Sequence, residues 1–352
     1  MRKILIIYAI VCLATIFVWN VTSDDLFSYI FSSRIFSKFG VNPYYVPYDT
    51  FKSDALYSSL KTVWSSKTFD HGPALLLLGT VLTKLAGDNL FLNIYLFKIT
   101  LAIFNFLTGY LLYKISHSKK AFLLYAFNPV VLWDLGLDSH DEALVIFFLA
   151  LSLFLFFQNQ KVKNNALGFL ALTASFLVKF TVAIFAPFYT LFFMKNKQKN
   201  KWLFLFGAGV LSLILVALAH LPFWDGLDIY QRTSLITNAE FPYPAPGIFL
   251  ASLILPFHQA KFLSQSVFFI AYFALTVKFL FVRQINPERL VRFLVIAAAL
   301  LFGFYPTLLL PWYLTLPIFL LALAYGVSKK KVYEWALYLV SAGSFFLHLI
   351  IA

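Results

Sequence analysis

Two adjacent carboxylates, Asp24 and Asp25, follow the first apolar run of the chain and are the sharpest chemical signal in it. Tyr29 and Arg34 come after them at helical spacing. Where bilayer hydrocarbon gives way to water, a carboxylate need not be neutralised, and nearby apolar surface can make it a usable base. A charge at such a place can also simply cap the next helix. Both interpretations fit these residues taken alone.

Carboxylates and an imidazole gather a second time, within nine residues. This second cluster consists of Asp134, Asp138, His140, Asp141 and Glu142. The simpler interpretation is a solvated turn before an apolar run that begins at residue 143, with a helix cap at its end. A carboxylate together with an imidazole could also hold a divalent ion, although the spacing alone does not support one.

Basic side chains supply the third kind of candidate. Arg34 offers a forked donor that matches phosphate oxygens. Lys179 lies between two short apolar runs, where an ammonium is costly unless it is paired or reaches the headgroups. Lys98 and Lys278 lie nearer the ends of apolar runs, which favours headgroup contact for both.

The composition identifies the class of protein that must position these residues. Of 352 residues, 61% are hydrophobic and 12% are charged, with a mean hydropathy of +0.82. Soluble domains are about a quarter charged, so the sequence predicts a polytopic, all-α membrane protein. Arg2-Lys3 and the apolar run Ile4–Trp19 lack a small-residue cleavage site and predict a retained first span. The single cysteine, Cys12, excludes a disulfide framework.

Apolar runs and the bias of Lys and Arg predict about eleven transmembrane helices with a cytoplasmic N-terminus. The predicted spans are Ile4–Asn20, Asn93–Tyr113, Ala121–Trp133, Ala143–Phe157, Ala166–Val178, Phe180–Met194, Trp202–Leu221, Phe262–Phe281, Leu290–Phe304, Leu308–Tyr325 and Val332–Ile350. This topology puts 13 of the 15 acidic residues outside, so the net charge of +13 indicates orientation and not nucleic-acid binding.

Pro73–Leu85 and Gly247–Phe257 are predicted as amphipathic helices along the outer interface, because counting either as a span would reverse the charge sorting. The outer side then carries a first loop of about 21–92, a second site at about 134–142 and a third loop of about 222–261. Repeats and flexible linkers are absent from the sequence, which predicts one domain over residues 1–352.

Four motifs in this order resemble the GT-C superclass of membrane glycosyltransferases. They are Asp25…Tyr29…Arg34…Gly40-x-Asn42-Pro43-Tyr44, His71-Gly72-Pro73, Phe127-Asn128-Pro129 with Gly136 and Ser139-His140-Asp141, and Pro311-Trp312-Tyr313 with Pro317. The set is most similar to polyprenol-phosphate-mannose-dependent mannosyltransferases and to the catalytic subunit of GPI mannosyltransferase I. The first motif departs from the Asp-x-Asp of the GPI enzymes, since the chain has Asp24-Asp25.

The resemblance implies an inverting hexosyltransferase, a mannosyltransferase by its nearest families, which moves the sugar from a polyprenyl-phosphate donor to a lipid-linked or surface glycan. It implies an extracytoplasmic active site with Asp25 as the base and Asp24 as its partner or substitute. The donor-binding residues expected are Arg34, His71, Lys179, His140 and Asp141, and those expected at the acceptor are Tyr29 and Arg232. No cofactor is implied with certainty, and a divalent metal beside Asp25 stays open.

A transporter or flippase for a lipid-linked saccharide is the alternative. It would account for the spans, the outer acidic clusters and the membrane lysines. Transporters usually place polar groups near the bilayer midplane and are often built of two repeated halves. Here the ionisable residues gather at one side and no repeat is visible, which favours the enzyme. Walker, GxGxxG, CxxC and HExxH motifs are absent from the sequence.

Overall fold

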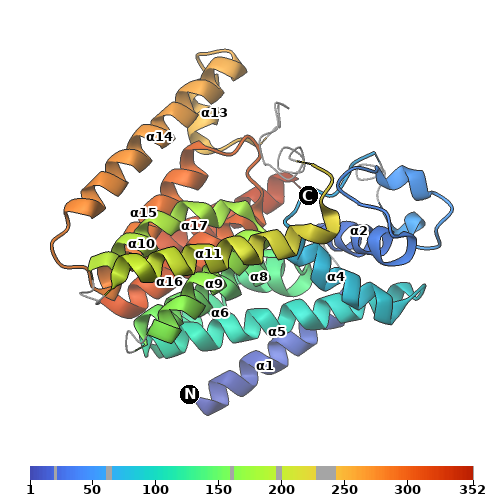
Figure 1. Cartoon of the computed structure of the whole chain (residues 1–352), viewed down its shortest axis with the longest axis horizontal. Helices are drawn as coiled ribbons and strands as arrows, with labels where there is room; N and C mark the ends of the chain where they lie inside the picture. The colour runs from blue at the N-terminus through green and yellow to red at the C-terminus, as the bar shows by residue number, and fades with distance from the viewer. Residues whose placement is uncertain (20–21, 61–65, 159–161, 196–199, 227–242, 352) are drawn as a thin grey trace.

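The computed structural model describes residues 1–19, 22–60, 66–158, 162–195, 200–226 and 243–351, which fold into helices joined by turns (Figure 1). In chain order these are α1 (Arg2–Ile16), α2 (Asp25–Phe39), η1 (Tyr48–Phe51), η2 (Tyr57–Ser59), α4 (Pro73–Ala86), α5 (Leu90–Ser116), α6 (Lys119–Ala126), α7 (Pro129–Val131), η3 (Leu132–Leu137), α8 (Glu142–Phe157), α9 (Val162–Val178), η4 (Phe180–Phe185), α10 (Ala186–Lys195), α11 (Lys201–His220), η5 (Leu221–Phe223), α13 (Pro246–Ser252), α14 (Phe257–Phe281), α15 (Pro287–Phe304), η6 (Pro311–Leu314), α16 (Thr315–Ser328) and α17 (Lys331–Ile351). The described residues contain no strand.

Four helical segments of the described chain are long and apolar enough to cross a bilayer: Leu90–Ser116, Lys201–Phe223, Phe257–Phe281 and Pro311–Ser328. Pro129–Leu137 and Glu142–Phe157 make a fifth apolar stretch, bent by 114° at the turn between them. The protein is therefore an all-α, multi-pass membrane protein, as its composition predicts. Eleven spans stay a prediction, because several predicted segments fold as shorter helices.

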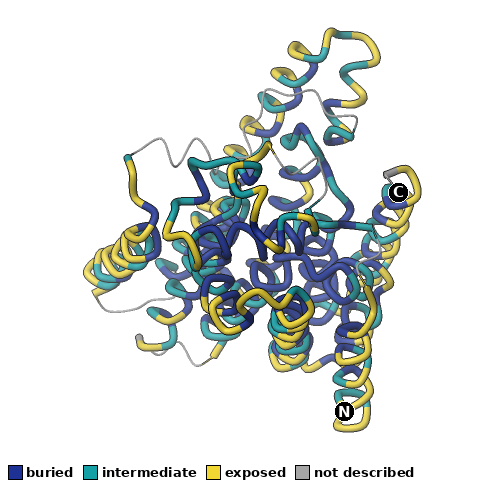
Figure 2. The backbone as a smooth tube through the Cα atoms, turned by 90° about the vertical axis from the view of Figure 1, so that its right-hand side faces the viewer, coloured by how far each residue is buried: buried dark blue, intermediate teal, exposed yellow. Residues whose placement is uncertain are grey.

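The surface of the helices agrees with a lipid environment. Buried residues concentrate in the middle of the molecule, while the ends and outer helices are exposed (Figure 2). α14, which extends away from the body in Figure 1, leaves large apolar side chains open. These include Phe262, Phe269, Ile270, Phe273 and Phe281. A soluble protein rarely exposes so contiguous an apolar face, whereas lipid tails cover it without cost.

One predicted span is an interrupted helix. Ala121–Trp133 was expected to be continuous, but α6 ends at Ala126 and a new helix starts at Pro129. The proline has no N–H to offer to the preceding turn, and the Asn128 side chain accepts the N–H of Val130 and so caps the new start. The wider π-helical turn η3 follows, and it directs the second acidic cluster into the protein.

α2 is the most deeply buried helix of the first predicted loop. All residues from Asp25 to Ile35 are buried, and the helix ends at Gly40, whose φ of +66° suits the left-handed cap that glycine tolerates. α4 packs along it, and a Cβ on Gly79 of α4 would lie 2.0 Å from Ser33 Oγ of α2. α4 has 14 residues, about 21 Å of helix, which is shorter than the hydrocarbon core. Its placement along the interface stays a prediction.

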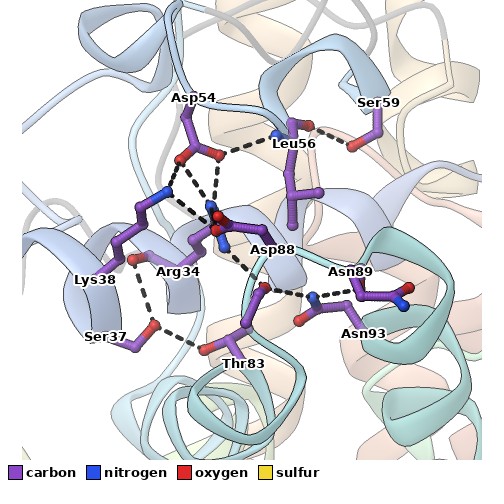
Figure 3. Close-up of polar contacts among 11 residues, drawn as sticks. Arg34, Ser37, Lys38, Asp54, Leu56, Ser59, Thr83, Asp88, Asn89 and Asn93 are labelled. Carbon is purple, nitrogen blue, oxygen red and sulfur yellow. Dashed lines mark hydrogen bonds and ion pairs between the residues drawn. The ribbon is translucent and has the colours of Figure 1, made fainter.

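Arg34 lies on α2 at the opposite end from the acidic pair and is enclosed by partners of its own (Figure 3). Its Nε and Nη2 donate to the Asp54 carboxylate at 2.7 and 2.9 Å, and its Nη1 donates to the Gly87 carbonyl at 2.8 Å. Asp88 accepts from the same guanidinium, and Lys38 Nζ donates to Asp54 at 2.9 Å. This network joins α2 to the segment after η1 and to the turn between α4 and α5.

Candidate active site

The fold brings Asp25 and His140 together from the first and second predicted outer loops. Asp25 opens α2, and its Oδ2 lies 3.4 Å from Nδ1 of His140 in the turn before α8. The imidazole of His140 stacks on Trp312 of η6, with ring centroids 4.0 Å apart and planes 15° from parallel. Three of the motifs that resemble one family in sequence therefore meet at one point in the structure.

A second group of contacts centres on Asp141. Tyr29 lies one helical turn after Asp25 on α2, so both side chains share a face, and its hydroxyl donates to Asp141 Oδ1 at 3.2 Å. Lys179 Nζ donates to the same oxygen at 3.2 Å and to Glu142. His71 Nε2 lies 3.8 Å from Asp141 Oδ2. One carboxylate thus holds two cationic side chains beside the turn that carries His140.

Local backbone geometry explains how Lys179 and His71 come to lie side by side. α9 ends at Val178, and Lys179 is extended before η4 begins. The N–H of Gly72 donates to the Val178 carbonyl at 3.0 Å. A Cβ on Gly72 would lie 2.1 Å from the Leu177 carbonyl oxygen, so glycine is what allows this loop to reach the end of α9.

The charge of His71 follows from its neighbours. Burial alone would lower the pKa of this imidazole, but the carboxylates of Asp141 and Asp70 raise its pKa to about 9. Asp70 Oδ1 lies 2.8 Å from Nδ1 of the ring. His71 is therefore a cation at neutral pH. The second cation, Lys179, also lies over the ring of Tyr313, 4.8 Å from its centroid.

The residues of this cluster differ in the exposed fraction of their side chains. The side chains of Asp25, His71 and Lys179 are 11%, 18% and 10% exposed, whereas those of His140 and Asp141 are fully buried. The cluster thus leaves one carboxylate and two cations partly open to the outside, while His140 and Asp141 contact these groups from within the protein.

Three of the expected site residues make other contacts in the structure, and their expected roles stay predictions. Arg34 stands nine residues after Asp25, about 14 Å along α2, and its donors go to Asp54, Asp88 and Gly87. The Tyr29 hydroxyl, expected at the acceptor, is buried and donates to Asp141. Asp24 is the N-cap residue of α2, and its carbonyl accepts from Phe27 N–H at 3.0 Å. Arg232 lies outside the described residues.

Four residues in or near the site were not assigned a catalytic or binding role from the sequence. Glu142 and Asp70 are ion-pair partners of Lys179 and His71, and their positions next to candidate residues were the available signal. Trp312 stands in the fourth motif, but the sequence assigned it no contact with His140. His348 approaches Asp134 from α17, and nothing in the sequence indicates that contact.

The fold and this cluster define a multi-pass membrane protein with a partly exposed carboxylate near two partly exposed cationic side chains. The sequence of residues 1–195 matches the model of the MptA/B family, described as alpha-(1->6)-mannopyranosyltransferase, N-terminal domain. Because this match covers more than half of the 352 residues, the chain belongs to that family. The matched part contains Asp25, His71, His140, Asp141 and Lys179.

Two curated relatives agree with this assignment. Alpha-(1->6)-mannopyranosyltransferase A of Mycobacterium tuberculosis is 26% identical over 207 residues, which are 56% of this chain and 39% of the relative. The protein of the same name from Corynebacterium glutamicum is 26% identical over 187 residues, 52% of this chain and 37% of the relative. The match thus spans about two fifths of the length of each relative.

Proposed function

We propose that this protein is an inverting, GT-C-type mannosyltransferase. It moves mannose from a polyprenyl-phosphate donor to a lipid-linked or surface glycan on the outer side of the membrane, and it forms the α-(1→6) linkage for which its relatives are named. The observation that carries the proposal is the juxtaposition of Asp25 with the cationic pair His71 and Lys179, the three reachable groups of the buried cluster.

Asp25 serves as the general base in this mechanism. It takes the proton of the acceptor hydroxyl while the bond from C1 of mannose to the phosphate oxygen breaks and C1 gains oxocarbenium character. The acceptor oxygen attacks from the face opposite the leaving phosphate, so one displacement inverts the configuration at C1. Nδ1 of His140 faces one oxygen of Asp25 at 3.4 Å, so a proton on Nδ1 would stabilise that oxygen and leave the other for the acceptor.

Lys179 and His71 bind the donor phosphate. Two of the three N–H donors of Lys179 go to Asp141 and Glu142, which leaves the third for a phosphate oxygen. His71 is protonated at neutral pH and adds a second positive charge. The phosphate that leaves is already an anion, so these two cations stabilise it without transferring a proton. This is why one carboxylate is enough for the reaction.

The proposal is tested with the purified protein in sealed liposomes, with radiolabelled polyprenyl-phosphate mannose and a crude membrane-lipid acceptor extract. We expect label to move to the acceptor, and methylation analysis to show 6-substituted residues beneath the new mannose. GDP-mannose in place of the lipid donor should give no product. Donor binding without transfer of mannose or any other hexose would reject the enzyme in favour of the flippase, and product formed only from substrates on the cytoplasmic face would reject the outer site.

Donor binding should depend on the protonation of His71. Since its pKa is raised to about 9, the cation is present below that pH, and the donor KM should rise as the pH increases through 9. In His71→Gln the donor KM should be about 10-fold higher at pH 7, with this pH dependence lost, because a hydrogen bond to a charged group is removed. The measurement is initial transfer rate against donor concentration from pH 6.5 to 10. His117→Gln, an exposed histidine, is the control, and an unchanged pH profile in His71→Gln would contradict this role.

A further inference from the structure

We propose that Asp134, Asp138 and His140 bind one divalent transition-metal ion such as Zn²⁺ or Mn²⁺, with His348 as a fourth ligand. One donor atom from each of the first three residues lies within 4.8 Å of the others. These side chains are 0%, 1% and 0% exposed. This proposal does not depend on the mannosyltransferase activity, because ion binding can be measured without substrates.

Two members of this cluster, Asp134 and His140, have polar atoms that lack the hydrogen bonds that burial normally demands. Neither carboxylate oxygen of Asp134 and neither ring nitrogen of His140 has a hydrogen-bond partner among the described residues. Buried polar atoms are nearly always hydrogen-bonded, and each exception requires an explanation. A bound ion would explain these unpaired atoms, because it would coordinate the imidazole and the carboxylate together. It would also neutralise two buried acidic side chains.

His348 is placed to complete the set from a distant helix. Its Nε2 lies 2.9 Å from Asp134 Oδ1, yet neither atom makes a hydrogen bond. Two ligands at about 2.0–2.1 Å from a common ion stand about 3 Å apart, which is close to this separation. Two ligands of one metal ion, seen without the ion, would show this combination of a short separation and no hydrogen-bond geometry. Binding would then draw the remaining donors inward from their present separation.

The surrounding backbone holds the three ligands in place. They lie on the π-helical turn η3 and the tight turn after it, where the N–H of His140 donates to the Asp134 carbonyl at 3.0 Å and Ser139 has a φ of +59°. The N–H of Thr22 donates to Asp138 at 3.2 Å, and Trp133 Nε1 donates to Thr22 Oγ1 at 3.1 Å. Such outer partners orient metal ligands in known sites.

The donor set selects the kind of ion. Two carboxylates and one or two imidazoles suit Zn²⁺, Mn²⁺ or a similar transition metal, whereas Mg²⁺ and Ca²⁺ prefer oxygen ligands alone. Since Nδ1 of His140 faces Asp25, the geometry favours Nε2 as the metal ligand. The proton then stays on Nδ1 and points at Asp25, which is the carboxylate–histidine–metal arrangement of many metalloproteins. The ion would thus position His140 and, through it, Asp25.

The test is metal binding by the untagged protein in lipid nanodiscs after treatment with a chelator. We expect one equivalent of Zn²⁺ by mass spectrometry after dialysis, one equivalent of Co²⁺ with the absorption of an imidazole-containing site, and no competition by Mg²⁺. In Asp134→Asn the affinity should fall by more than about 100-fold, beyond the 10- to 100-fold that loss of an outer partner costs. Asp49→Asn and His258→Gln, which change a carboxylate and an imidazole elsewhere, should bind as the wild type does.

Two outcomes would overturn the site: wild-type protein that holds less than a tenth of an equivalent of every transition metal tried, or equal affinity in Asp134→Asn. If Asp134→Asn does not fold, the wild-type protein still decides. Its Co²⁺ spectrum must show nitrogen coordination, and its unfolding temperature must rise with Zn²⁺ and not with Mg²⁺. Failure of mannose transfer while this ion binds would reject the proposed function and leave the metal site standing.

Discussion

Asp25→Asn is expected to lower the rate of mannose transfer by about 10²–10⁴-fold, the usual contribution of a general base. The amide has nearly the same shape as the carboxylate but cannot take the acceptor's proton. Donor affinity should change little, because Lys179 and His71 keep their partners Asp141, Glu142 and Asp70. The measurement is single turnover with saturating polyprenyl-phosphate mannose, beside equilibrium binding of the same donor.

Asp24→Asn is the matched control, since it makes the same chemical change one residue earlier. Asn caps a helix as well as Asp does, and Asp24 is the N-cap residue of α2, so this variant should retain most of the transfer rate. A large loss in Asp24→Asn with a nearly unaffected Asp25→Asn would move the base to Asp24. Normal rates in both variants would show that this acidic pair has no catalytic role.

Arg34→Met is expected to cost about 3 kcal/mol of folding free energy, because it leaves the carboxylate of Asp54 buried without its partner. The side chains of Arg34 and Asp54 are 2% and 1% exposed. Burial alone would raise the pKa of Asp54, but hydrogen bonds from Arg34 lower it to about 2. This contribution to stability is therefore complete above the ordinary pKa of Asp, near 4, and is lost as the pH falls toward 2. Denaturant unfolding in mixed micelles measures it.

Asp88→Asn is the control within the same network (Figure 3). Asp88 also pairs with Arg34, but its side chain is 69% exposed, so its removal should destabilise the protein far less than the loss of Arg34 does. The donor KM of Arg34→Met should equal that of the wild type when compared per folded molecule. A raised donor KM with unchanged stability would instead support the donor-binding role that was expected for Arg34 from the sequence.

The acidic motifs show how much of the site can be predicted from the sequence. Asp25, His140 and Asp141 were selected as candidates from residue types and from a family resemblance. All three lie in residues 1–195, the part of this chain that matches the family model. Their contacts could not be predicted, because each depends on ångström-scale packing between helices far apart in the chain. The stacking of His140 on Trp312 and the approach of His348 to Asp134 are such contacts.

Arg34 shows what residue type alone does not decide. A guanidinium nine residues after a candidate base is a reasonable phosphate ligand in sequence, but a buried charge binds whichever carboxylate the fold brings within reach. The turn after η1 and the turn between α4 and α5 supply Asp54 and Asp88, and neither turn has a signal that indicates its position.

The sequence by itself determined that this is an all-α membrane protein, since a chain that is 61% hydrophobic and 12% charged must hide its backbone polar groups in helices whatever their arrangement. It also determined which loops carry carboxylates, imidazoles and cations. Only the tertiary structure decided that Asp25 faces His140, that Asp141 contacts both Lys179 and His71, and that Arg34 pairs with Asp54. The physical reason is range: hydropathy and helix breaks act along the chain, whereas hydrogen bonds and ion pairs form only between atoms that the packed helices bring within a few ångströms.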